Sequence, residues 1–135
     1  MVEIVRQTDA TPTVNYDIVS LAVSIETLKG VLIMKRIING KVYNTETAEK
    51  VAFWDNDLFA NDFGYMSEAL YVTRKGNYFI HGKGGATSKY ATHAYGGRMA
   101  GESIVAIAEK DALEWCETRE IDTEIVSSHF EIEEA

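Results

Sequence analysis

Alternation of apolar and polar residues is clearest in the middle of the chain. Residues 70–73 and 77–81 are rich in β-branched and aromatic side chains. They flank Arg74-Lys75-Gly76, which suits a three-residue hairpin loop with glycine in the left-handed conformation. Because the side chains of a strand alternate between its two faces, this register predicts which residues share a face. One face carries Leu70 and Val72 opposite Ile80 and Tyr78, and the other carries Tyr71, Thr73, Phe79 and His81.

A second hairpin and a helix are predicted before this one. Asn39-Gly40 is the preferred pair for a two-residue type I′ turn, so residues 34–44 are expected to form two strands in which Ile37 pairs with Val42. Residues 45–54 then fit a helix with an acidic first turn. Its cap would be Asn44 or Thr45, and its inner side would carry Ala48, Val51 and Ala52.

The first 33 residues contain one further helix candidate, for which two interpretations stay open. Helical spacing of apolar residues favours a helix that packs on the core. Alternatively, Lys29-Gly30-Val31 can be encoded by the purine-rich ribosome-binding sequence of bacteria, which would make Met34 a start and residues 1–33 an upstream extension. The helix would carry Ile18, Leu21, Ala22, Ile25 and Leu28 on one side, with Asp17 or Asn15 as cap and Gly30 as stop.

The last third of the chain is predicted to hold one strand and two helices. Residues 103–108 are apolar throughout, as expected of a strand covered on both faces, and they follow a long surface loop at residues 90–101. Helices are expected at residues 109–119 and 121–130. The inward side chains would be Ala112, Trp115 and Cys116 in the first helix, and Ile121, Ile125 and Val126 in the second.

These elements predict an α+β fold in which residues 34–135 form a single domain. We expect a small antiparallel sheet of two hairpins plus one further strand, with helices packed on one face and an acidic pair of helices at the C-terminal end. The 46% hydrophobic content suffices for a buried core. No apolar stretch reaches the roughly 20 residues that a membrane helix needs.

The cellular setting is predicted from the single cysteine and the first residues. Cys116 alone allows neither an intramolecular disulfide nor a cysteine zinc site, and MVEIVRQTDA lacks a basic segment followed by an apolar run. We therefore expect a reducing, cytoplasmic setting and no membrane partner.

Charge is distributed unevenly along the sequence. Residues 109–135 contain ten acids and two bases, so this segment alone carries 2 − 10 = −8, which equals the net charge of the chain. Such a surface can imitate nucleic-acid phosphates and occupy a basic cleft on another protein. The alternative is an ordinary solvated helix face. The candidate partner-binding residues are Glu114, Glu117 and Glu124.

The middle of the chain suits a different kind of partner, a nucleic acid or a phosphate-bearing ligand, because residues 69–101 contain no acid. Successive glycine N–H groups after residue 81 can line an anion-binding nest, and nearby aromatic rings can stack on bases. The alternatives are a flexible turn and the half-buried aromatic residues of a sheet. The candidate ligand-binding residues are Arg74, Lys75, Lys83, Gly84, Gly85, Ser88 and Lys89, and the stacking candidates are Tyr71, Tyr78, Phe79, Tyr90 and Tyr95 with Arg98.

The sequence contains no strong pattern of catalytic residues. The three histidines have no paired metal-ligand spacing, and Cys116 is predicted on the inner side of a helix as a packed, inert thiol. We therefore expect no metal and no cofactor. A small enzyme acting through His81 or His93 is the third and least favoured hypothesis.

A resemblance to known proteins is carried by three stretches, KRIINGKVYNTETAEKVAFW, LYVTRKGNYFIHGKGGATSKY and IVAIAEKDALEWCE. They resemble a group of small uncharacterised proteins from phages and conjugative elements of gram-positive bacteria. The resemblance covers the chain from Met34 onward and is most specific in the tyrosine strand joined to GxGGAxSKY. It implies a mobile-element accessory role, for which countering a host defence such as CRISPR or restriction is a common task.

The leading hypothesis is therefore a non-enzymatic interaction protein that binds a host protein through its acidic C-terminal helices. A nucleic-acid or phosphate-ligand binding module that uses the basic hairpin and the glycine-rich loop is the second.

Overall fold

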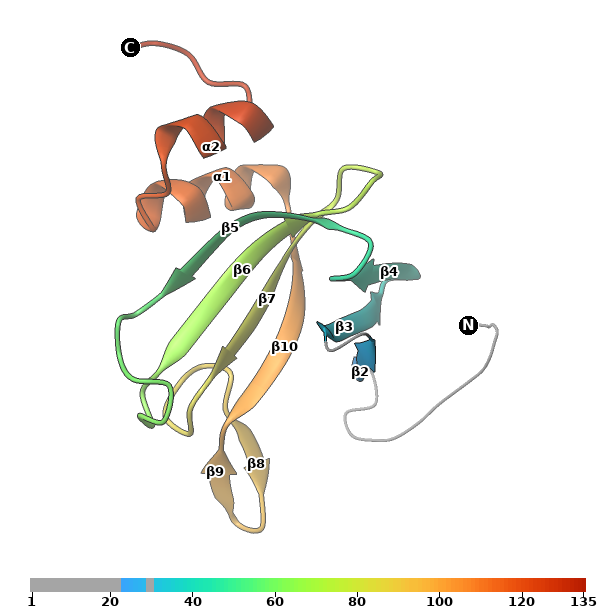
Figure 1. The fold of residues 1–135 in the computed structure, drawn as a ribbon, viewed down its shortest axis with the longest axis vertical. Helices are drawn as coiled ribbons and strands as arrows, with labels where there is room; N and C mark the ends of the chain where they lie inside the picture. The colour runs from blue at the N-terminus through green and yellow to red at the C-terminus, as the bar shows by residue number, and fades with distance from the viewer. Residues whose placement is uncertain (1–22, 29–30) are drawn as a thin grey trace. The chain divides into compact units, whose positions relative to one another are not determined.

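The computed structural model describes residues 23–28 and 31–135, with side chains described from Met34 onward. The chain divides into two compact units, Met1–Val42 and Tyr43–Ala135, and each is described by itself. Antiparallel sheets and two helices make up the described part, which confirms the predicted α+β fold (Figure 1).

Three strands form the first sheet, in the order β2-β3-β4. Strand β2 (Val23–Leu28) runs antiparallel to β3 (Val31–Ile38), and β4 (Lys41–Asn44) lies on the other side of β3. Asn39 and Gly40 have φ angles of 52° and 77°, as a type I′ turn requires. The hairpin predicted from Asn39-Gly40 is confirmed.

Strand β2 corrects the prediction of an N-terminal helix. Residues 23–28, including Ile25 and Leu28, form a strand, while the earlier part of the predicted helix lies outside the described residues. The sequence VSIETL also alternates apolar and polar side chains over its first four residues, so it satisfies both periodicities. Pairing with β3, which places Ile25 opposite Met34, decides in favour of the strand.

The second unit is built on a four-stranded antiparallel sheet in the order β10-β7-β6-β5. Its central hairpin joins β6 (Met66–Val72) to β7 (Tyr78–Gly84) with Leu70 opposite Ile80 and Val72 opposite Tyr78, the predicted register. The Thr73 N–H donates to the Asn77 carbonyl across the turn at 2.8 Å, and Gly76 has a φ of 87°. The three-residue loop with a left-handed glycine is therefore confirmed.

The helix predicted for residues 45–54 is wrong, because Glu49–Asp55 forms strand β5 at the edge of this sheet. The register shifts between Lys50 and Ala52, so Val51 is an extra residue in a β-bulge. Val51 and Ala52 are both buried although they are adjacent. The bulge therefore interrupts the alternation of inward and outward side chains that is typical of a strand. Two adjacent apolar residues face the core, and this pattern had indicated a helix.

Two predictions for the following segment also need correction. Residues 90–101 contain a short hairpin, β8 (Thr92–Ala94) and β9 (Gly97–Met99), rather than only loop. Strand β10 (Gly101–Ile107) was expected to be covered on both faces, but it lies at the edge of the sheet and Val105 is exposed. An apolar run alone does not distinguish an edge strand from a central one.

The core of the second unit lies between the sheet and the two helices, α1 (Glu109–Thr118) and α2 (Thr123–His129). Leu70 and Ile80 of the sheet cluster with Ala112 and Cys116 of α1 and with Phe130, which follows α2. Cys116 is buried as predicted, and burial raises the pKa of its thiol. In the described part of the chain, no helix has the length and apolarity needed to cross a membrane.

Candidate functional site

The outer sides of α1 and α2 present an acidic face, which we define by the exposed carboxylates of Glu114, Glu117 and Glu124. The inner side of α1 joins the core through Ala112 and Cys116, with partly buried Trp115 beside them, while α2 contributes the partly buried Val126. Among residues 34–135, none of the three carboxylates forms an ion pair with another described residue. The partner-binding candidates are therefore all exposed to solvent, two on α1 and one on α2.

The two bases of this segment do little to neutralise the acidic face. Arg119 turns inward and donates to the buried Glu68 carboxylate at 3.1 Å, which leaves Lys110 as the exposed base of residues 109–135. Surface charges without a partner are fully available to a binding protein, because no internal ion pair has to be broken. The face is thus more acidic than the sequence alone indicates.

Apolar side chains accompany these acids. Ile125 was expected to point inward, but 38% of it is exposed, while Ile121 and Val126 pack against the core. Ile132 is 49% exposed in the segment that follows α2. Protein interfaces combine a few apolar anchors with a polar rim, so exposed isoleucines beside carboxylates suit a protein partner.

Glu68 is the most heavily bonded carboxylate of the second unit, and sequence reasoning missed it. Only 2% of the residue is exposed. One carboxylate oxygen accepts from Trp115 Nε1 at 2.7 Å and from Arg119 at 3.1 Å, and the other accepts from the Tyr90 hydroxyl at 2.6 Å and from Lys89 Nζ at 2.9 Å. Each oxygen therefore has two donors, which meets the capacity of a buried carboxylate.

The electrostatics of this cluster are dominated by its hydrogen bonds. Burial alone would raise the pKa of Glu68, but the hydrogen bonds from Tyr90, Trp115, Lys89 and Arg119 outweigh it and lower the pKa to about 2. Burial and the bond to the carboxylate raise the pKa of Tyr90 in turn. Glu68 is therefore ionised and Tyr90 neutral at physiological pH.

This cluster fixes α1, which carries Glu114 and Glu117 of the acidic face. Arg119 follows α1 and stacks over the Trp54 ring at 3.6 Å, while Trp115 lies within α1. Tyr90 packs against Gly82, where a side chain would collide with its ring. One buried charge thus ties the end of α1 and the segment after β7 to strand β6.

The seven ligand-binding candidates are not brought together. Arg74 and Lys75 lie in the β6–β7 turn, at one end of β7, whereas Lys83, Gly84 and Gly85 lie at the other end of that strand. Lys89 is committed to Glu68, and Ser88 is buried. A single phosphate group cannot contact both ends of a seven-residue strand, because each residue adds about 3.3 Å.

The glycine-rich loop does not have the geometry of an anion nest. Gly84 and Gly85 lack the positive φ of such nests, and the N–H groups of Gly85, Thr87 and Ser88 donate to backbone carbonyls of the protein. The glycines serve close packing instead. A side chain on Gly85 would collide with the Phe63 carbonyl, and one on Gly84 with Ser88.

Most of the stacking candidates are core residues. Tyr71, Tyr78, Phe79 and Tyr90 are buried, and the Tyr71 and Phe79 rings stack with centroids 5.1 Å apart. The interpretation as sheet aromatics is therefore correct for Tyr71, Tyr78 and Phe79, whereas Tyr90 is buried in the turn between β7 and β8. Tyr95 is the exception, because it is fully exposed on the β8–β9 turn.

A cleft of about 360 Å³ lies beside Lys83 and Glu102. His81 Nε2 contacts the Glu102 carboxylate at 2.8 Å, and this hydrogen bond lowers the pKa of Glu102. A histidine oriented by a carboxylate can act as a base, but no hydroxyl or thiol of the described residues hydrogen-bonds to His81. The cleft is lined by Ala60, Tyr65, Lys83, Gly84, Gly85, Ala100, Gly101 and Glu102.

The other histidines do not form a better catalytic group. His129 contacts Glu49 at 3.2 Å and Ser128 at 3.0 Å, which brings a hydroxyl, an imidazole and a carboxylate together. However, the Ser128 hydroxyl donates to the Ile125 carbonyl at 2.8 Å, so its proton is not directed at the histidine. His93 is exposed on β8. No group of three or more possible metal ligands occurs among the described residues.

Comparison with known proteins finds no matching family model, no matching curated protein and no matching solved structure. The function is therefore inferred from the chemistry of these surfaces.

Proposed function

We propose that this protein is a non-enzymatic interaction protein whose acidic face binds a basic surface of a host protein. The partner surface would be one that ordinarily binds nucleic acid, so the acidic face acts as a nucleic-acid mimic. The resemblance to proteins of phages and conjugative elements suggests the setting. There, an accessory factor of this kind would serve anti-defence, against CRISPR or restriction, in the bacterial cytoplasm.

The observation that carries the proposal is the orientation of charges on α1 and α2. Glu114, Glu117 and Glu124 are exposed without ion pairs to described residues, while Arg119 points inward to Glu68. Unpaired surface carboxylates attract a basic partner over long range and favour correct orientation during encounter. The Glu68 cluster supports the same proposal, since it holds the end of α1 rigidly against the sheet.

The second hypothesis, a nucleic-acid or phosphate-ligand binding module that uses the basic hairpin and the glycine-rich loop, has weaker support. Its cations lie at both ends of β7 or are engaged, as Lys89 is by Glu68. An enzyme acting through His81 or His93 lacks a positioned nucleophile among the described residues. Neither alternative accounts for the concentration of charge at residues 109–135.

The experiment is capture of partners from a gram-positive bacterial lysate on the immobilised full chain, with and without nuclease. The expected result is a protein of high isoelectric point that is retained after nuclease treatment and is released as salt rises, because salt screens charges over about 8 Å at physiological ionic strength. Retention of partners only when nucleic acid is intact would contradict the proposal.

A further inference from the structure

The β8–β9 hairpin carries an aromatic residue in an unfavourable position. Tyr95 and Gly96 have φ angles of 53° and 77°, so they form the two central residues of a type I′ turn. Asn, Asp and Gly favour the first of these positions, whereas a bulky residue with positive φ is a conformational outlier. Tyr95 is also fully exposed, so burial of its ring does not compensate for the strain.

A strained and fully solvated tyrosine has no role in the stability of the hairpin. Residues kept in unfavourable backbone conformations concentrate at binding sites, and here the outlier is observed directly. The neighbouring Met99 is also exposed.

The charges around Tyr95 indicate the chemistry of that partner. Arg98 lies directly opposite His93 in the hairpin, and residues 69–101 contain no acid. Tyr95 therefore lies in a hairpin that carries one guanidinium, that of Arg98, and one imidazole, that of His93, and no carboxylate. Sites for single-stranded nucleic acid combine such groups, because bases stack on exposed rings and phosphates contact cations.

The hairpin is fixed at its base, so it presents Tyr95 in a defined position. Arg98 donates to the Ser88 carbonyl at 3.0 Å, and the Thr92 hydroxyl donates to the Ala100 carbonyl at 3.4 Å. Gly101 approaches the Tyr90 carbonyl so closely that a side chain there would collide with it. A rigid ring loses little conformational freedom on binding, which favours affinity.

The acidic face is too distant to repel a nucleic acid at the hairpin. Figure 1 shows the β8–β9 hairpin at the opposite end of the four-stranded sheet from α1 and α2. The seven-residue strand β7 alone spans about 20 Å, and exposed charges are largely screened beyond about 8 Å at physiological salt.

We propose that the β8–β9 hairpin binds single-stranded nucleic acid, with the Tyr95 ring stacked on a base and with His93 and Arg98 beside the phosphates. This site is separate from the acidic face and does not rest on the proposed function. It also differs from the glycine-rich loop, whose N–H groups are engaged within the protein.

The test measures binding of the full chain to a fluorescent, single-stranded oligothymidylate of about twelve nucleotides by anisotropy. Tyr95→Asn should weaken binding about five-fold to 150-fold, because stacking on an aromatic ring contributes that much per base. The same substitution should raise the melting temperature, since Asn is favoured in the turn. Tyr95→Trp should retain binding, because its ring still stacks.

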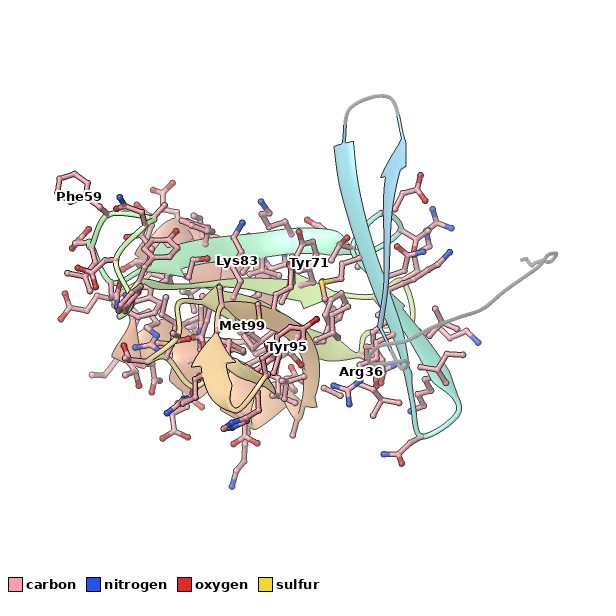
Figure 2. The ribbon with its side chains drawn as sticks, turned by 90° about the horizontal axis from the view of Figure 1, so that it is seen from below. Arg36, Phe59, Tyr71, Lys83, Tyr95 and Met99 are labelled. Atoms are coloured by element: carbon pink, nitrogen blue, oxygen red, sulfur yellow. The ribbon has the colours of Figure 1, made fainter. Side chains whose placement is uncertain are left out.

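Phe59→Ala is the matched control. Phe59 is 84% exposed, but it lies in the β5–β6 loop, which also carries Asp57 and Asp62 (Figure 2). The proposal expects Phe59→Ala to bind like the wild type, and it expects a duplex of the same length to bind more weakly because its bases are already stacked. Absence of wild-type binding, equal loss with Phe59→Ala, or equal affinity for duplex would each overturn the proposal.

Discussion

Glu68 joins parts of the chain that are far apart in the sequence. Its donors Tyr90, Trp115 and Arg119 follow it by 22, 47 and 51 residues. A glutamate within the strand MSEALYV gives no local sign of these partners, so the sequence could not predict the cluster. The alternation of residues 66–72 does place Glu68 on the same face as Leu70, but only the folded chain brings the donors to that face.

Glu68→Gln should destabilise the protein by about 3–5 kcal/mol at pH 7, because it removes the buried negative charge that pairs with the partly buried Arg119 and with the exposed Lys89. The measurement is the free energy of unfolding from urea titrations. Glu114→Gln is the matched control, since an exposed carboxylate without an ion pair should change stability by less than about 0.5 kcal/mol. Equal stability of Glu68→Gln and the wild type would contradict the role of the cluster.

The difference in stability between the wild type and Glu68→Gln should depend on pH. The pKa of Glu68 is lowered from 4.5 to about 2 in the folded protein, so its ionised form stabilises the fold. That contribution is fully present above pH 4.5 and is lost as the pH falls towards 2. The difference between wild type and Glu68→Gln should therefore shrink over this window. A difference that stays constant from pH 7 to about pH 2 would mean that the carboxylate is not ionised in the fold.

At the scale of elements, turns were predicted correctly from their own residues. Elements whose conformation depends on contacts with distant parts of the chain were not. The Asn39-Gly40 and Arg74-Lys75-Gly76 turns could be predicted because their residues determine the backbone conformation directly. Strand β5 could not, because its bulge at Val51 hides the strand period. The β8–β9 turn escaped notice because Tyr95 occupies a position where Asn or Gly is expected.

Close packing around Gly85 of the glycine-rich loop should matter for stability. Gly85→Ala should destabilise the protein by about 1–3 kcal/mol, because its side chain would overlap the Phe63 and Asp62 carbonyls and force the loop apart. Gly97→Ala is the control, since a side chain there meets nothing within 4 Å. Thermal unfolding of the two variants makes the comparison. A Gly85→Ala protein as stable as Gly97→Ala would show that the close packing is unimportant.

At the scale of the whole molecule, the second unit carries its own core. Among residues 34–135, whose side chains the structure describes, every member of the core cluster, from Val51 to Phe130, belongs to Tyr43–Ala135. A chain that begins at Met34 would lose β2 and the first residues of β3, but none of that cluster. We therefore expect it to unfold cooperatively, with nearly the melting temperature of the full chain, when followed by circular dichroism. An unfolded Met34–Ala135 chain would show that the first 33 residues are part of the working domain.

The charge distribution of the second unit could be predicted from the sequence. Which charges and apolar side chains reach the surface of the acidic face could not, because that depends on the direction of each side chain. Counting acids identified residues 109–135 as the acidic segment, and helical spacing correctly placed Glu114, Glu117 and Glu124 outward. Neither method showed that Arg119 turns towards Glu68 or that Ile125 remains exposed. Both features support the proposed binding of a basic protein partner, because they leave the carboxylates without a neighbouring guanidinium and add an exposed apolar side chain.

Reversal of charge on the acidic face tests the proposed function most directly. The variant Glu114→Lys, Glu117→Lys, Glu124→Lys is compared with Arg74→Glu, Lys75→Glu, Lys83→Glu in one binding assay against the captured host protein. All six residues are exposed, so both variants should fold. The account predicts that the acidic-face variant loses binding, with slower association, while the basic-residue variant binds like the wild type. Loss of binding only in the basic-residue variant would contradict it.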